Sequence, residues 1–288
     1  MPNDMLEGAV SLVTGGAQGI GWAIAQAFAD HGARVHVCDI SEAAIARAQA
    51  SLVEAPWGSR ITIHRCDVSQ RNEVERLIET IVARDGRIDV LVNNAAFIRC
   101  KPIDELTIDE AEASMRVAYN GMVYTVKSVL PAMRARGSGY VVNLGSSAGR
   151  IQLGQTSTAY AATKAAIEAY TRELQVELEG SGVSAILIRP GAVAGTTFFG
   201  EHVPWSRMPR ASDFIPVLLP PNVAEAVVHA IQRRQLVMDV PSYLPWVYLF
   251  FDLAPRLFRR LLAVGGGSQR DHGAAAWRYE GNDREVRR

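Results

Sequence analysis

The sequence predicts an α/β protein, a doubly wound parallel sheet of seven strands with helices on both faces. Short apolar segments of strand length alternate with longer segments of helical periodicity between residues 9 and 240. This alternation is typical of parallel strands joined by right-handed crossovers. Turns rich in glycine, asparagine or serine follow several of the apolar segments. Ligands of such sheets bind at the carboxyl ends of the strands, so these turns are the candidate site.

The composition is that of an ordinary globular protein. With 288 residues, of which 48% are apolar and 21% charged, the chain can bury a sizeable core. The formal net charge is zero, so we expect no nucleic-acid partner. Cys38, Cys66 and Cys100 form no Cys-x-x-Cys pair, which argues against a metal site or a disulfide framework. Without a signal peptide or an apolar run of about 20 residues, we expect a cytoplasmic protein.

The first strand and the turn after it predict a nucleotide-binding site. Residues 9–13 run into Thr14-Gly15-Gly16-Ala17-Gln18-Gly19-Ile20-Gly21, and a helix continues to Gly32, its expected C-terminal glycine. Glycines allow a tight turn and close approach of a pyrophosphate, and the helix N-terminus offers free N–H groups. We therefore expect a Rossmann-type turn whose cofactor contacts are Gly15, Gln18, Gly19, Ile20 and Gly21. A glycine-rich turn without a ligand is the plainer alternative.

The second strand, residues 34–38, ends in Asp39, at the interval after Gly15 that dinucleotide-binding folds use. A carboxylate there accepts hydrogen bonds from both ribose hydroxyls of NAD and repels the 2′-phosphate of NADP. Neither Gln18 nor Ile40 offers a cation to that phosphate. The sequence therefore favours NAD (NADH) as cofactor, with Ile40 beside the ribose. Capping of the next helix, for which Ser41 is also placed, is the alternative role of Asp39.

The third strand and the fourth strand complete the first half of the sheet. Residues 61–64 lead to Asp67, which is placed to face the adenine, and residues 70–84 have the periodicity of an amphipathic helix. Residues 88–92 form the fourth strand, and Asn93-Asn94-Ala95-Ala96 follows it.

A long apolar helix is expected from Ile108 to Arg136, with Asn120-Gly121 inside it. Both residues are poor in a helix interior, where glycine costs about 1 kcal/mol relative to alanine. The pair predicts a local distortion that frees a backbone carbonyl to hold a water beside Lys164. A tolerated polar residue at a helix contact is the alternative.

The fifth strand, residues 139–144, delivers Ser146 and Ser147, and a helix over 158–179 carries Tyr160 and Lys164. The spacing of i and i+4 places the phenol and the ammonium on one helix face. A fixed ammonium lowers the pKa of a phenol from about 10, and a hydroxyl such as that of Ser147 can hold a substrate oxygen. These groups form a proton-transfer device for a carbinol or a carbonyl, although the spacing alone is common on ordinary helices.

The sixth strand, residues 183–188, is expected to stop at Pro190-Gly191, and residues 236–240 are expected to form the seventh. Between them, residues 192–215 are apolar and weakly patterned, as in a lid over a hydrophobic substrate. The apolar residues of this expected lid include Phe198, Phe199, Trp205, Met208 and Phe214. A packed surface loop is the alternative.

These residues together resemble the short-chain dehydrogenase/reductase family over about residues 7–240. The resemblance is carried by Thr14-Gly15-x-x-x-Gly19-x-Gly21, Asn93-Asn94-Ala95, Asn120, Ser147, Tyr160-x-x-x-Lys164 and Pro190-Gly191. It implies that Tyr160 is the general acid/base, and that Lys164 lowers the pKa of Tyr160 and binds the nicotinamide ribose. The family's spacing from serine to tyrosine selects Ser147 over Ser146 to orient the substrate oxygen. By the same resemblance Asn120 anchors a proton-relay water. The further implied cofactor contacts are Asp67, Val68, Asn93, Ala95, Pro190, Gly191, Val193 and Thr196.

The chain departs from the family pattern at three places. Ala96 replaces a usual glycine, and Gly195 stands where a threonine is common, so the nicotinamide contact lies with Thr196 or Thr197. The C-terminal region after residue 240 also differs. We therefore divide the chain into a Rossmann-fold catalytic domain, residues 5–240, and a C-terminal extension, residues 241–288.

The extension has an aromatic and amphipathic segment followed by a polar tail that we expect to be flexible. Leu257, Phe258, Leu261 and Leu262 are expected to form one apolar helix face, opposite Arg256, Arg259 and Arg260. We expect the segment to pack on a neighbouring subunit of a homodimer or homotetramer, or over the substrate cleft. Peripheral contact with a membrane surface is the alternative.

Together these patterns predict an NAD-dependent oxidoreductase that interconverts a secondary alcohol and a ketone. The lid and the extension favour a hydrophobic substrate of lipid, steroid, terpenoid or polyketide type. Two alternatives stay open: an epimerase or dehydratase on the same scaffold, and a non-catalytic nucleotide-binding protein. The residues in the four catalytic positions are chemically competent, which argues against the non-catalytic alternative.

Overall fold

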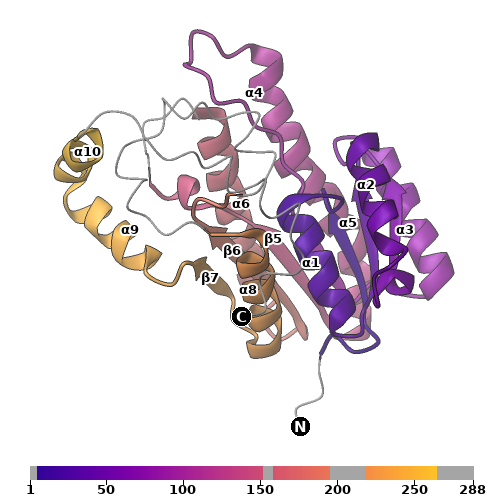
Figure 1. Ribbon diagram of the computed structural model, residues 1–288. Coiled ribbons are helices and arrows are strands. Elements are labelled where there is room, and N and C mark those ends of the chain that lie inside the picture. The colour runs from indigo at the N-terminus through magenta and orange to yellow at the C-terminus, as the bar shows by residue number, and fades with distance from the viewer. Residues whose placement is uncertain (1–4, 152–157, 195–217, 265–288) are drawn as a thin grey trace.

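The computed structural model describes residues 5–151, 158–194 and 218–264, and their strands form one parallel sheet (Figure 1). The strand order is β3-β2-β1-β4-β5-β6-β7, so the chain changes its direction of winding between β1 and β4. This arrangement confirms the predicted Rossmann-type, doubly wound sheet of seven strands. The strands are β1 (Val10–Thr14), β2 (Arg34–Asp39), β3 (Ile61–Arg65), β4 (Val90–Asn93), β5 (Gly139–Leu144), β6 (Val183–Pro190) and β7 (Val237–Val240).

Helices cover both faces of the sheet, and each face has its own apolar core. Alternate residues of a strand point to opposite faces, so Val13 packs under α1 and α8 while Leu12 packs under α3 and α5. Figure 1 shows α1 and α8 side by side on the near face. The first face carries α1 (Gly19–Asp30), α2 (Glu42–Leu52) and α8 (Pro220–Arg233); the other carries α3 (Arg71–Asp85), α5 (Gly121–Arg136) and α6 (Thr158–Glu177). Short 3-10 segments are η1 (Gly58–Arg60) and η3 (Ser147–Gly149).

Local signals set several element ends as the sequence predicted. Helix α1 ends with His31 as its C-cap and Gly32 at φ +85°, a left-handed conformation that glycine adopts without strain. The hydroxyl of Ser41 caps α2 by accepting a hydrogen bond from the backbone N–H of Ala44. Strand β6 ends at Pro190, which forms the last pair of its ladder with Val240. The prediction that this strand stops at Pro190-Gly191 is therefore confirmed, and a proline is tolerated at a strand end.

The expected single helix from Ile108 to Arg136 is interrupted. The structure contains α4 (Ile108–Ser114), a π-helical segment η2 (Met115–Asn120) and α5, so the predicted distortion at Asn120-Gly121 is present. A Cβ on Gly121 would lie 3.0 Å from the carbonyl oxygen of Val68, which explains why the helix passes this point with a glycine. π-helical turns shift the carbonyl pattern of a helix and are frequent at functional sites.

The extension forms two further helices beyond β7, α9 (Leu244–Leu253) and α10 (Pro255–Ala263) (Figure 1). Pro245 and Pro255 lie in the first turns of these helices, where a missing N–H costs no hydrogen bond. Leu244, Tyr248, Phe251 and Phe258 form a separate apolar cluster with Ile151. None of the helices in the described ranges is long and apolar enough to cross a bilayer.

Candidate active site

The candidate site lies at the carboxyl ends of β1, β2, β4 and β5, where the predicted motifs meet. The glycine turn follows β1, Asp39 ends β2, Asn94 follows β4, and Ser146 follows β5. Helix α6 brings Tyr160 to this edge from its first turn. In doubly wound sheets ligands bind at this edge, beside the change in winding direction.

The turn between β1 and α1 has the conformation that a phosphate requires. Gly15 and Gly19 adopt φ of +58° and +56°, where a side chain is strained. Gln18 is the N-cap of α1 and makes no side-chain cap, and the first turn of the helix contains no acidic residue. The N–H groups of this first turn therefore have no side-chain cap and no competing carboxylate, and the positive end of the helix dipole favours an anion.

Asn94 holds this turn against β4. Its side-chain amide donates hydrogen bonds to the carbonyl oxygens of Thr14, at 3.0 Å, and Gly15, at 2.8 Å. The hydroxyl of Thr14 in return accepts the backbone N–H groups of Asn94 and Ala95, each at 3.1 Å. A Cβ on Gly21 would lie 2.5 Å from the Asn94 amide nitrogen, so the glycine at this position makes room for the clamp. The sequence did not single out Asn94 for this function.

Asp39 connects the glycine turn to the start of α2. One oxygen of its carboxylate accepts the backbone N–H of Ala17 at 3.2 Å, and the other accepts that of Ser41 at 3.0 Å. The side chain is 7% exposed, and each oxygen retains a lone pair for a further donor. Ile40 beside it is 54% exposed and offers no charge. The capping role weighed for Asp39 belongs to Ser41 instead.

Asn93 and Val68, two of the predicted cofactor contacts, make contacts with other residues of the protein. The amide of Asn93 donates to Asn143 at 2.9 Å and accepts the hydroxyl of Thr125 at 2.6 Å, and Asn143 donates to Thr171 at 3.0 Å. This buried chain joins α5, β4, β5 and α6 beneath the site. Val68 is buried and its backbone meets Gly121. Asp67 is partly exposed and accepts the backbone N–H of Ser69 at 2.9 Å.

The hydroxyl of Tyr160 is hydrogen-bonded to Ser146, the serine that precedes the predicted Ser147. Ser146 is the N-cap of η3, and its oxygen accepts the backbone N–H of Ala148 at 3.1 Å, which leaves the hydroxyl proton free for donation. Ser147 lies inside η3 and is buried. The choice of Ser147 over Ser146 as the serine that orients the substrate oxygen stays a prediction.

Burial raises the pKa of Tyr160 to about 12, while the hydrogen bond from Ser146 acts in the opposite direction. The net direction is opposite to the lowering that the resemblance implied for Lys164. The ammonium nitrogen lies over the ring of Tyr160, 5.6 Å from its centroid. Removal of a phenolate from water therefore outweighs the attraction of the cation.

Lys164 is 4% exposed, and its ammonium donates a hydrogen bond of 2.7 Å to the carbonyl oxygen of Leu144. Burial lowers its pKa to about 8. A Cβ on Gly149 would lie 3.1 Å from the carbonyl oxygen of Lys164, so this glycine lets η3 approach α6 closely. Asn120 ends the π-helical segment, which packs against α6.

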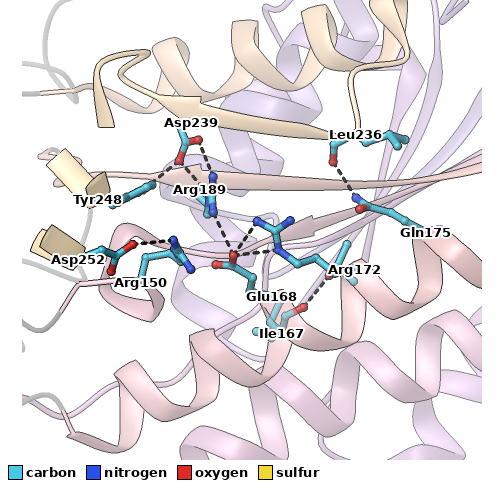
Figure 2. Close-up of polar contacts among 11 residues, drawn as sticks. Arg150, Ile167, Glu168, Arg172, Gln175, Arg189, Leu236, Asp239, Tyr248 and Asp252 are labelled. Carbon is cyan, nitrogen blue, oxygen red and sulfur yellow. Dashed lines mark hydrogen bonds and ion pairs between the residues drawn. The ribbon is translucent and has the colours of Figure 1, made fainter. Parts of the chain in front are cut away.

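A buried network of charges supports α6 one turn after Lys164 (Figure 2). Arg189 of β6 binds Asp239 of β7 through two hydrogen bonds, of 2.8 and 2.6 Å, and Glu168 of α6 at 3.0 Å. Tyr248 of α9 donates to the same Asp239 at 2.9 Å, which ties the extension to the network. The second carboxylate oxygen of Glu168 is buried without a hydrogen-bond partner. The sequence analysis did not identify this network.

Comparisons with known proteins identify the family to which a chain with this geometry belongs. The family model for short chain dehydrogenases matches residues 9–206, more than half of the chain. The chain belongs to the short-chain dehydrogenase/reductase family. It is an oxidoreductase of that family, as the predicted resemblance implied.

Relatives within the short-chain dehydrogenase/reductase family cover most of this chain. An uncharacterized oxidoreductase of Staphylococcus saprophyticus is 32% identical over 79% of this chain and 93% of its own. A tropinone reductase homolog of Arabidopsis thaliana is 34% identical over 69% of this chain and 76% of its own. A metagenomic short-chain oxidoreductase, solved in complex with NADP, has a TM-score of 0.66 and 25% identity, covering 81% of this chain and 96% of that one.

The short-chain dehydrogenase/reductase family binds a nicotinamide cofactor, and the described residues fit such a group. The uncapped N-terminus of α1, the glycine turn and the carboxylate of Asp39 offer the donors and the acceptor that a dinucleotide needs. Gly191, which follows β6, donates its backbone N–H to Val240, and Val193 is buried beside Leu218. Thr196, Thr197 and the apolar residues of the expected lid lie outside the described residues. Within the described part of the chain, no three side chains of metal-binding type come together.

Proposed function

We propose that this protein is an NAD(H)-dependent oxidoreductase that interconverts a secondary alcohol and a ketone on a hydrophobic substrate. The observation that carries the proposal is the hydrogen bond between Ser146 and Tyr160, one helical turn from the buried ammonium of Lys164. A hydroxyl pair at the carboxyl edge of the sheet can hold one substrate oxygen and exchange a proton with it. A bound nicotinamide would supply or accept the hydride.

Each residue of the chain has a separate task in this proposal. Tyr160 gives a proton to the oxygen of a ketone or takes one from a carbinol. Ser146 donates its hydroxyl proton to the same oxygen, while its own oxygen accepts the N–H of Ala148. The positive charge of Lys164 stabilises the phenolate form of Tyr160 whenever the proton has left. The hydrogen bond to Leu144 fixes Lys164 at the end of β5 for this task.

The proposed preference for NAD over NADP depends on Asp39. Its carboxylate stands next to the glycine turn, where two ribose hydroxyls can donate to it. A 2′-phosphate at the same place would meet this negative charge, and neither Gln18 nor Ile40 offers a cation to balance it. The NADP found with the metagenomic relative belongs to that protein.

The proposed apolar substrate is supported by the surroundings of the site. Ile151 follows Ser146 and Ser147 in the sequence, and its side chain packs into the apolar cluster of the extension. The aromatic composition of residues 192–215 adds a sequence argument for the same substrate class.

The experiment is a spectrophotometric assay at the nicotinamide absorbance. The purified protein is incubated with NADH and a panel of apolar ketones, and with NAD and the matching secondary alcohols. Net NADH consumption or formation supports the proposed reaction. An epimerase or dehydratase would convert its substrate without net change in NADH, and a non-catalytic protein would bind NADH without converting any compound of the panel.

A further inference from the structure

Helix α9 is apolar on two opposite faces, and only one of them is covered. Leu244, Tyr248 and Phe251 pack into the cluster with Ile151. The opposite face of the helix consists of Trp246, Leu249, Phe250 and Leu253, which are 74%, 47%, 37% and 76% exposed. Helices that are apolar all round are normally buried all round. The exposed side of α9 therefore predicts a partner.

Helix α10 continues this surface, and only part of its expected apolar face is covered. Phe258 is buried and Leu262 packs on the same cluster, whereas Leu257 and Leu261 are 50% and 53% exposed. The ring of Phe258 contacts that of Phe250 with centroids 5.7 Å apart, which joins the two helices. We call the exposed set the apolar surface of the extension: Trp246, Leu249, Phe250, Leu253, Leu257 and Leu261.

Positive charge accompanies this surface. Arg256, Arg259 and Arg260 are exposed on α10, and the helix contains no acidic residue. Asp252, the acidic residue of α9, is already paired with Arg150 at 3.3 Å. The extension is thus locally basic although the whole chain has a formal net charge of zero. Tryptophan beside leucines and arginines is the composition of helices that lie in a membrane interface.

We propose that the apolar surface of the extension docks on a membrane that contains anionic lipids. Helices α9 and α10 would lie in the plane of the interface, with the leucines and Trp246 among the acyl chains and the arginines at the head groups. A second copy of the chain fits less well. A two-fold interface brings the same patch of both copies together, so it would place two basic segments close to each other without an acidic partner on α10.

The proposed orientation would turn the active-site edge toward the lipid. Ile151 lies in the same apolar cluster as α9, and its segment begins at Ser146. An apolar substrate could then pass from the bilayer to the site with little exposure to water. The docking surface itself is independent of the proposed reaction, because binding to vesicles needs no turnover.

Cosedimentation of the full-length protein with vesicles tests the proposal. One vesicle preparation contains phosphatidylcholine alone, and the other also contains phosphatidylglycerol. The wild-type protein is expected to sediment with the second preparation and to be released by high salt. In the variant R256Q/R259Q/R260Q, partitioning to anionic vesicles should fall roughly a hundredfold, at about fivefold for each arginine. The variant W246S/L253S should lose binding to a similar or greater degree.

The matched controls change the same residue types elsewhere. The triple variant R47Q/R71Q/R233Q removes three exposed arginines from α2, α3 and α8, and V53S removes an exposed apolar side chain at the end of α2. Both should bind as the wild type does, and circular dichroism melting should show that every variant is folded. Absence of wild-type binding to anionic vesicles would overturn the proposal. So would a dimer in light scattering that W246S/L253S converts to a monomer while vesicle binding is unchanged.

Discussion

The ammonium of Lys164 and the carbonyl oxygen of Leu144 are 2.7 Å apart, so a buried cation on α6 is fixed to the last residue of β5. Ser146 follows Leu144 by two positions and binds the hydroxyl of Tyr160. The strand end thus aligns both the serine and the lysine with the tyrosine. The predictions below test this arrangement and the elements that support it.

Replacement of Lys164 by methionine should change how stability depends on pH. Burial lowers the pKa of Lys164 to about 8, whereas an unfolded lysine titrates near ~10.4. Between these values the unfolded chain binds a proton that the folded chain lacks, so the free energy of unfolding contributed by this group rises with pH. Above about pH 10 Tyr160 has the opposite effect, because its raised pKa lets the folded chain keep a proton that the unfolded chain loses. The free energy of unfolding contributed by Tyr160 therefore falls as pH rises.

Urea titrations at intervals between about pH 8 and about pH 10 measure this effect. The difference in unfolding free energy between wild type and Lys164→Met should shift in favour of the wild type as pH rises. A difference that stays constant across the window would mean that Lys164 keeps its ordinary pKa in the folded protein.

The two serines provide a matched pair of substitutions. Ser146→Ala removes the hydroxyl that meets Tyr160, and kcat should fall about 100-fold or more, as for other hydrogen-bond donors to a reacting oxygen. Ser147→Ala removes a hydroxyl inside η3 and should change kcat only a few-fold. Steady-state kinetics of both variants decide between them. The reverse order of effects would identify Ser147 as the substrate-orienting serine.

Asp39 should determine the choice of cofactor. The substitution Asp39→Ala should weaken NADH binding by about tenfold, the value of one or two hydrogen bonds to a carboxylate. The double variant D39A/I40R replaces the repelling carboxylate with a cation and should bind NADPH more tightly than NADH. Fluorescence titrations with both cofactors measure this preference. Tighter binding of NADPH than NADH by the wild type would refute this account of Asp39.

Arg189 should be a major contributor to stability. The substitution Arg189→Met leaves the carboxylate of Asp239 without its cation and that of Glu168 with Arg172 alone, which costs about 3–5 kcal/mol. Arg150→Met breaks the exposed pair with Asp252 and should cost about 1 kcal/mol or less. Chemical denaturation of both variants gives the comparison. Equal losses would show that the buried network contributes no more than a surface pair.

The sheet could be predicted from the sequence because many residues contribute to the alternation of strand and helix segments. Each strand is an apolar run bounded by a turn, and the glycine turn after β1 depends only on local conformation. The distortion at Asn120-Gly121 could likewise be predicted, since both residues are unfavourable in a helix interior. Signals of this kind need no knowledge of neighbours in space.

The remaining features depend on contacts between distant segments. Asn94 clamps the glycine turn, and Arg189 joins Glu168 to Asp239, yet nothing in the spacing of these residues indicates a partner. Cys38 and Cys66 are far apart in the sequence, but neighbouring strand ends bring their thiols into a hydrogen bond. The choice between Ser146 and Ser147 also depends on a contact in space, since both serines lie at the start of η3, near Tyr160.

The central claim is that Tyr160 moves the proton, and Tyr160→Phe tests it most directly. The substitution removes one oxygen and retains the ring next to Lys164. The measurement is single-turnover reduction of an accepted ketone by bound NADH, with NADH affinity determined in parallel. The account predicts a loss of rate of at least about 1000-fold with NADH affinity unchanged within a few-fold. A folded Tyr160→Phe protein that reduces the ketone at the wild-type rate would contradict it.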